Sequence, residues 1–219
     1  NLTSIDQTTD TCTNNFATAN PLTQSSATYS NGNLTLSGGN DLMGTIGVSQ
    51  GKWYWEVKKS NTTGTWHSGI VSTESASGST TQFLSGTNTN SGAIWINEST
   101  FITGRDGNTI SNYTHTDNIS SVSNGDIFGF ALDLDSSTKK ITYYQNGSEV
   151  GNTTFTYDGI TPVFPYFRMN TGVLADINFG NPPFSISSGN SDSEGHGNFE
   201  FSVPSGYYAL NTKNLAEYG

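Results

Sequence analysis

The sequence has 219 residues and a formal net charge of −10, with eight basic residues against 18 acidic ones. Nucleic acids and anionic membranes recruit clusters of Lys and Arg, because both present a dense negative charge. The only basic pairs are Lys58-Lys59 and Lys139-Lys140, so neither partner is expected. No run of 18 apolar residues occurs, which argues against insertion into a membrane.

Only 12% of the residues are charged, about half the usual share of ~25%, and Ser, Thr, Asn and Gly take their place. Aromatic residues make up another 12% and supply much of the area that a core can bury. Hydroxyl and amide side chains suit strands and turns. These proportions indicate one large all-β domain with long polar loops around a compact aromatic core.

Short runs of alternating apolar and polar residues recur along the chain, whereas helical periodicity is nearly absent. The first expected hairpin turns at Asn31-Gly32. In the strand after it, Trp53, Trp55 and Val57 alternate onto one face. This pattern predicts an antiparallel β-sandwich. The strands expected in this half are Ser26–Tyr29, Asn33–Leu36, Lys52–Val57, Ser68–Ser72 and Ala93–Asn97.

The second half begins with residues 97–124, which are polar and rich in turn formers, and we expect a mobile loop with a short strand pair there. The clearest hairpin follows, and further on residues 185–198 are rich in Ser, Gly and Asn and predict an exposed loop. No internal repeat and no interdomain linker is visible. The strands expected here are Ile127–Asp135, Lys140–Gln145, Val173–Phe179, Phe199–Val203 and Tyr207–Leu210.

Asp133 and Asp135 come nearest to a catalytic or metal-binding pattern. A sandwich-type glycosidase needs two outer acids along one strand, and Thr138 stands where the second would be. A calcium loop that begins at Asp133 lacks both the Gly of the sharp turn and a closing Glu. A solvated hairpin end is the simpler interpretation.

Asp192, Glu194 and His196 form a second loose cluster, in a Gly-rich stretch where exposed acids are common. The other histidines, His67 and His115, are too scattered to indicate a Ser–His–acid set. We therefore predict no catalytic residue, no metal and no cofactor.

Cys12 is the only cysteine, so the chain has neither an internal disulfide nor a zinc site built from Cys. Eight Asn-x-Ser/Thr triplets occur, as chance produces in a chain so rich in these residues, and whether any is glycosylated stays open. The chain begins with Asn1 instead of Met, which leaves open processing or a longer parent protein.

Four groups of segments, in this order, resemble the SPRY domain family. They are Gly51–Val57, His67–Val71, Gly125–Asp135 with Ile141–Gly147, and Pro162–Tyr166 with Ile177–Phe184. The resemblance implies an all-β antiparallel sandwich, a concanavalin A-like jelly roll of the SPRY type, over residues 34–184. It also implies that the aromatic residues of these segments belong to the core and not to a binding site.

The two flanks, Asp10–Leu22 and Val203–Leu215, resemble the lead-in and exit of SPRY-containing bacteriophage proteins. The expected organisation is therefore a lead-in at 1–33 that packs on the sandwich or adds strands to it, the sandwich at 34–184, and an exposed loop with closing strands at 185–219.

The resemblance implies a non-enzymatic structural or adhesion protein of a phage virion, such as a fibre, spike or capsid decoration. Its partners would be other virion proteins or a host surface glycan, and its place the surface of the particle, in the head or the tail. A homo-oligomer is compatible with this role. The alternative is a cellular SPRY module that binds other proteins, and a further one is a glycosidase of the same fold.

SPRY domains bind through loops at one end of the sandwich, and aromatic faces with amide and carboxylate partners suit a glycan. Trp66-His67 is an aromatic pair at a junction of loop and strand. The expected ligand-binding residues are Trp66, His67, Arg105, Asn108, Tyr113, Tyr157 and Asp158.

Overall fold

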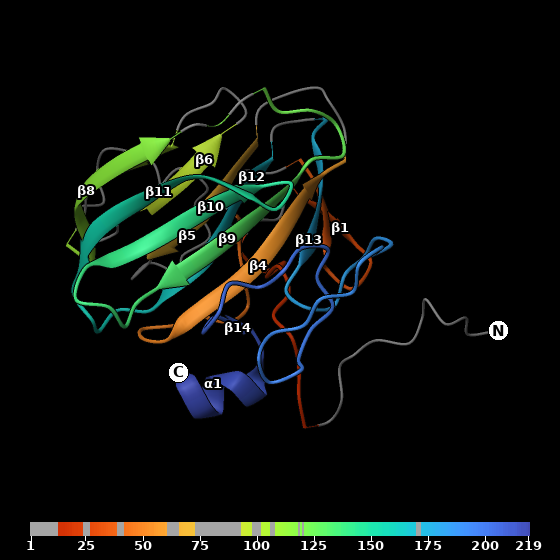
Figure 1. The fold of residues 1–219 in the computed structure, drawn as a ribbon. Coiled ribbons are helices and arrows are strands. Elements are labelled where there is room, and N and C mark those ends of the chain that lie inside the picture. Colours follow the sequence, from red (N-terminus) through yellow and green to blue (C-terminus); the bar gives the residue numbers. More distant parts are fainter. Residues whose placement is uncertain are drawn as a thin grey trace.

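A computed structural model shows two antiparallel β-sheets packed face to face (Figure 1). The structure describes residues 13–23, 27–38, 42–60, 66–72, 93–97, 102–105, 108–117, 119, 121–169 and 172–219. The antiparallel sandwich expected from the alternating pattern is confirmed.

Among the described residues, the larger sheet has nine strands, eight of them in the order β1-β2-β13-β4-β9-β10-β11-β8. The ninth, β14, pairs with β4 in parallel. The bounds are β1 Thr28–Ser30, β2 Thr35–Ser37, β4 Lys52–Lys59, β8 Ile110–Asp117, β9 Ile127–Asp133, β10 Lys139–Gln145, β11 Ser148–Tyr157, β13 Leu174–Asn178 and β14 Tyr208–Ala209.

In the part of the chain that the structure describes, the smaller sheet has five strands in the order β3-β12-β5-β6-β7. Their bounds are β3 Leu42–Met43, β5 Trp66–Ser72, β6 Ala93–Asn97, β7 Ile102–Arg105 and β12 Val163–Met169. The only helix in the described part of the chain is α1, Thr212–Tyr218, and no helix there is long and apolar enough to cross a membrane.

Aromatic side chains fill the space between the sheets. Trp55 of β4 stacks on Phe130 of β9 with ring centroids 5.5 Å apart, and both side chains are fully buried. Trp66 of β5 reaches across from the smaller sheet to Phe128, with centroids 4.9 Å apart. Alternation on the strands therefore places the aromatic residues of the family-like segments in the core, as expected.

The first hairpin turns where the sequence predicts it. Asn31 and Gly32 both have positive φ, at 51° and 67°, and β1 and β2 pair on either side of them. These backbone angles suit Asn and Gly because other residues pay a steric penalty there. The later strand prediction Val173–Phe179 is confirmed as β13, which begins and ends one residue inside it.

Two predictions are wrong. Residues 97–124, expected as a loop with a short strand pair, contain β7 and β8, which pair with β6 and β11 of the two sheets. Residues 199–203 form no strand, and only an isolated bridge joins Asn190 to Phe199. The expected last strand, Tyr207–Leu210, is confirmed as the short β14, which pairs in parallel and is followed by helix α1.

The two flanks of the sandwich are hydrogen-bonded to each other. The N–H of Ala17 donates to the carbonyl of Leu210 at 2.9 Å, and the N–H of Thr212 donates to the carbonyl of Asn15 at 2.9 Å. Of the lead-in motif 10–22, residues 10–12 lie outside the described part of the chain, as does Cys12 among them. The described remainder and the exit motif thus meet as one structural unit, while the proposed three-part division stays a prediction.

A buried carboxylate fastens residues 185–219, which we call the C-terminal segment, to the larger sheet. Glu56 is fully buried on the outer face of β4, and its oxygens accept from the backbone N–H groups of Glu200 at 3.0 Å and Phe201 at 2.9 Å. The amide of Asn178 on β13 donates to it at 3.0 Å, and the hydroxyl of Tyr54 donates at 3.3 Å. Burial raises the pKa of Glu56, although these four hydrogen bonds act in the opposite direction.

The raised pKa predicts how Glu56 affects stability. A carboxyl with a folded-state pKa above its unfolded value, about 4.5, stabilises the fold most at low pH, and this contribution is lost as the pH rises through the folded pKa. Glu56→Gln removes the titrating carboxyl group. It also places the NH₂ donor of an amide against the N–H donors that now bond to the carboxylate, which lowers the free energy of unfolding by about 2 kcal/mol. We expect the wild-type advantage over Glu56→Gln, from urea unfolding, to grow as the pH falls from 7 toward 4.5. A stability difference between the wild type and Glu56→Gln that is constant, or that grows with rising pH, would contradict a raised pKa of Glu56.

Candidate functional site

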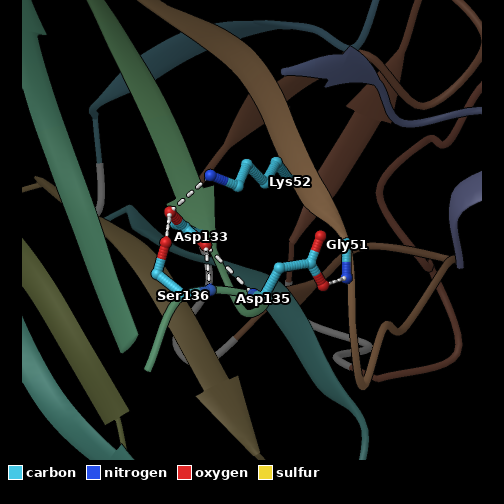
Figure 2. Close-up of polar contacts among 5 residues, drawn as sticks. All are labelled: Gly51, Lys52, Asp133, Asp135 and Ser136. Carbon is cyan, nitrogen blue, oxygen red and sulfur yellow. Dashed lines mark hydrogen bonds and ion pairs between the residues drawn. The ribbon is translucent and has the colours of Figure 1, made fainter. Parts of the chain in front are cut away.

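The acids at the end of the β9–β10 hairpin are structural. Asp133 accepts from the backbone N–H groups of Asp135 at 3.0 Å and Ser136 at 2.9 Å, from the Ser136 hydroxyl at 2.7 Å, and pairs with the Lys52 ammonium at 3.0 Å (Figure 2). Asp135 accepts from the N–H of Gly51 at 2.7 Å. Burial alone would raise the pKa of Asp133, but the Ser136, Lys52 and Asp135 donors lower it. Both carboxylates hold the hairpin to the start of β4.

The cluster at 192–196 is also structural. Asp192 is 5% exposed, and its carboxylate accepts from the N–H groups of Glu194, His196 and Ala209 at 3.0, 2.8 and 2.9 Å and from the Asn214 amide at 2.8 Å. The expectation of an exposed loop is therefore wrong at Asp192, which ties this stretch to β14 and α1. Within the part of the chain that the structure describes, no group of three His, Cys, Asp or Glu side chains is arranged to hold a metal ion.

The predicted ligand-binding residues separate into two ends of the sandwich. Trp66 pairs with Met169 at the end of β12, whereas Val163 at the start of β12 pairs with Ser72. Asp158 precedes β12 and so lies at the opposite end from Trp66. The seven residues therefore do not form one site.

The Trp66-His67 pair is not an exposed aromatic surface. Trp66 is 1% exposed and packs on Phe128 in the core. His67 is half-buried on the other face of β5, opposite Arg168, and burial together with the charge of Arg168 lowers its pKa to about 4. Stacking of a ligand on Trp66 would require the core to open.

Tyr113 belongs to a strand instead of a loop. It lies on β8 with its ring 4.8 Å from that of His115, and Nδ1 of His115 is 2.7 Å from the hydroxyl of Thr153 on β11. Tyr113 is half-buried and packs against the core. Arg105 ends β7 opposite Ala93, and its side chain lies outside the described residues.

The structure does bring Asn108, Tyr157 and Asp158 together. The N–H of Asp158 donates to the carbonyl of Thr109, the residue after Asn108, at 3.1 Å. Tyr157 pairs with Ile110 in the β11–β8 ladder. These contacts join the end of β11 to the start of β8, and the turn at 158–161 extends from them.

A network of hydrogen bonds fixes this turn. Asp158 accepts from the N–H groups of Ile160 at 2.9 Å and Thr161 at 3.0 Å, and from the Thr161 hydroxyl at 2.8 Å. The hydroxyl of Tyr157 donates to the carbonyl of Thr161 at 2.7 Å. Burial opposes ionisation of Asp158, but the donors at Ile160, Thr161 and Thr109 lower its pKa. Burial and the charge of Asp158 raise the pKa of Tyr157 to about 12, so its hydroxyl stays a donor at neutral pH.

Ile160 is the functional candidate that sequence reasoning missed. It sits in the turn after Gly159 with 81% of its surface exposed, although most large apolar side chains of the described chain are buried. An isoleucine between turn-forming residues was the available signal, because solvated turns favour Gly, Pro, Asn, Asp and Ser. The candidate site is therefore the rigid turn Asp158–Thr161, which we call the Ile160 turn, with Asn108 beside it.

Comparison with known proteins supports the fold. The SPRY domain family matches residues 52–182. Among solved structures, the TRIM65 PSpry domain has a TM-score of 0.52 and 16% identity, over 74% of this chain and 92% of that one. The SPRY domain of human HERC1 has a TM-score of 0.45 and 19% identity, over 73% of this chain and 96% of that one. A comparison with curated protein sequences finds no match.

The network in the Ile160 turn leads to a prediction about local stability. Asp158→Ala removes the hydrogen bonds that the carboxylate accepts from Ile160, Thr161 and Thr109, and loss of a capping side chain of this kind costs about 1 kcal/mol. We expect urea unfolding to show this loss, and amide exchange at Ile160 and Thr161 to accelerate. Asp158→Asn is the matched control, because it keeps one oxygen for the two backbone donors. Equal exchange rates in the wild type and Asp158→Ala would show that the carboxylate does not order the turn.

Proposed function

The chain belongs to the SPRY domain family, and we propose that it binds a protein partner through the Ile160 turn. SPRY domains are protein-interaction modules and not typically catalysts. The observation that carries the proposal is an isoleucine that is 81% exposed on a turn fixed by side-chain hydrogen bonds.

The Ile160 turn has the physical properties of a binding anchor. Protein interfaces bury apolar side chains at their centre and keep polar groups at the rim. Here Asp158 belongs to the turn and bonds to Thr109, the residue after Asn108, and both Asn108 and Asp158 are exposed polar residues. Because Asp158 already orders the turn, little conformational entropy remains to be lost on binding.

The phage interpretation rests on sequence outside the matched family range. The motifs at 10–22 and 203–215 flank residues 52–182, and their described parts bond to each other through Ala17, Leu210, Asn15 and Thr212. A shared structural role accounts for their occurring together. Placement at a virion surface, contact with other virion proteins and assembly as a homo-oligomer remain predictions, and the interaction module is the proposal we favour.

The proposal is tested by charging the exposed anchor. Ile160→Asp should lower recovery of the partner at least tenfold in quantitative affinity purification from the source material, because a carboxylate would have to be desolvated in place of an apolar side chain. Leu22→Asp is the matched control. Leu22 is 89% exposed on a turn in which its N–H donates to the Asn20 side chain at 3.0 Å.

The partner must be lost with Ile160→Asp and kept with Leu22→Asp. Recovery that survives Ile160→Asp, or falls equally in both variants, would remove the Ile160 turn as the binding site. Circular dichroism and urea unfolding of both variants would exclude misfolding as the cause.

A further inference from the structure

The outer face of the larger sheet is divided into a covered half and an open half. The C-terminal segment covers the β4 half, where Phe199 packs edge-on against Tyr54 with centroids 5.2 Å apart and β14 pairs with β4 (Figure 1). On the other half, Thr114 and Thr116 of β8 are exposed, and Asn152 and Thr154 of β11 are partly exposed. The strands β11 and β8 therefore present their outer face to solvent, whereas Thr142 on the same face of β10 is buried.

Strand register orders the side chains on this open half into two rows. Asn152 and Thr116 lie side by side across β11 and β8, next to the buried Thr142 of β10. Lys140, Thr154 and Thr114 form the next row. Alternate residues such as Tyr143 and Thr153 point into the core, where their hydroxyls are 3.3 Å apart, so the two rows share the outer face.

The open half is polar but almost free of charge. Its charged side chains among the described residues are Lys140 and Glu149, of opposite sign, in a chain whose net charge is −10. Hydroxyl and amide groups both donate and accept hydrogen bonds, so such a surface complements a ligand that also carries neutral donors and acceptors. A protein partner would instead favour an apolar centre, which this face lacks.

Tyrosines border the polar rows on the side of the C-terminal segment. Tyr144 of β10 and Tyr207 before β14 are both half-buried, so part of each ring remains exposed. Lys52 lies 5.8 Å from the centroid of the Tyr207 ring. Burial raises the pKa of Tyr207 to about 12, with the charges of Asp133 and Glu149 adding to the effect, so the hydroxyl is a neutral donor at physiological pH.

From this arrangement we propose that the outer face of β11 and β8, with Lys140, Tyr144 and Tyr207 at its border, binds a neutral polysaccharide. The Thr and Asn rows would hydrogen-bond the sugar hydroxyls, and the exposed parts of the tyrosine rings would pack against the apolar faces of the sugars. This inference does not depend on the proposed protein partner, because the Ile160 turn lies at one end of the sandwich and not on the outer face.

Affinity gel electrophoresis tests the inference with soluble polysaccharides as the probes. The neutral panel consists of dextran, mannan, galactomannan, xylan and mixed-linkage β-glucan, and alginate is the acidic comparison. We expect at least one neutral polysaccharide to retard the wild type. Thr154→Arg and Thr116→Arg should each weaken that retardation at least tenfold, because a long charged side chain interrupts the rows.

Thr138→Arg is the matched control, because it makes the same substitution at an exposed position of the β9–β10 turn that belongs to neither row. Ile160→Asp should also leave the retardation unchanged, which separates this inference from the proposed function. Tyr144→Ala supplies a second variant at the border and should weaken binding. The inference is overturned if no neutral polysaccharide retards the protein, if alginate alone does, or if Thr154→Arg and Tyr144→Ala bind like the wild type.

Discussion

The carboxylate of Glu56 is the interaction on which the arrangement of the larger sheet depends. It lies on β4 without exposure to solvent and accepts from β13 through Asn178 and from the C-terminal segment through Glu200 and Phe201. The amide of Asn178 also donates to the carbonyl of Asn198 at 2.9 Å, so the two side chains together hold this segment in place. A buried carboxylate without an ionic partner is tolerated only because its hydrogen bonds replace the water that it has lost.

The same use of carboxylates recurs at the turns. Asp126 accepts from the Ser123 N–H at 2.8 Å and from the side chains of Gln145 and Asn146. Asp133 in its hairpin and Asp192 near α1 likewise accept from backbone N–H groups. Each carboxylate gathers donors that a turn would otherwise leave unpaired. Many of the acidic side chains thus accept hydrogen bonds from backbone N–H groups. The negative net charge alone is therefore a poor guide to the binding partners of the chain.

The sequence predicted a strand correctly where one of its faces is apolar, and it missed a strand where neither face is apolar. Trp53 and Trp55 alternate clearly, so β4 was predictable, whereas β8 contains Asn112, Thr114 and His115 and shows no apolar period. Trp66 was misjudged because β5 buries residues on both faces, so alternation could not tell the core side from the outer side. Burial of Asp192 arises from contacts with residues 17 and 22 positions away, which local pattern cannot reveal.

The position of the C-terminal segment also explains why two different surfaces remain available. Glu56 and β14 hold that segment over β4, so its aromatic residues cover the half of the sheet where Tyr54 needs a packing partner. The other half needs no cover, because Thr114, Thr116 and Thr154 on its outer face are stable in water. The Ile160 turn is anchored separately, through Asp158 and Thr109 at the end of the β11–β8 ladder. A ligand on the open half and a partner at the turn would therefore contact different surfaces, and substitutions that affect one should leave the other intact.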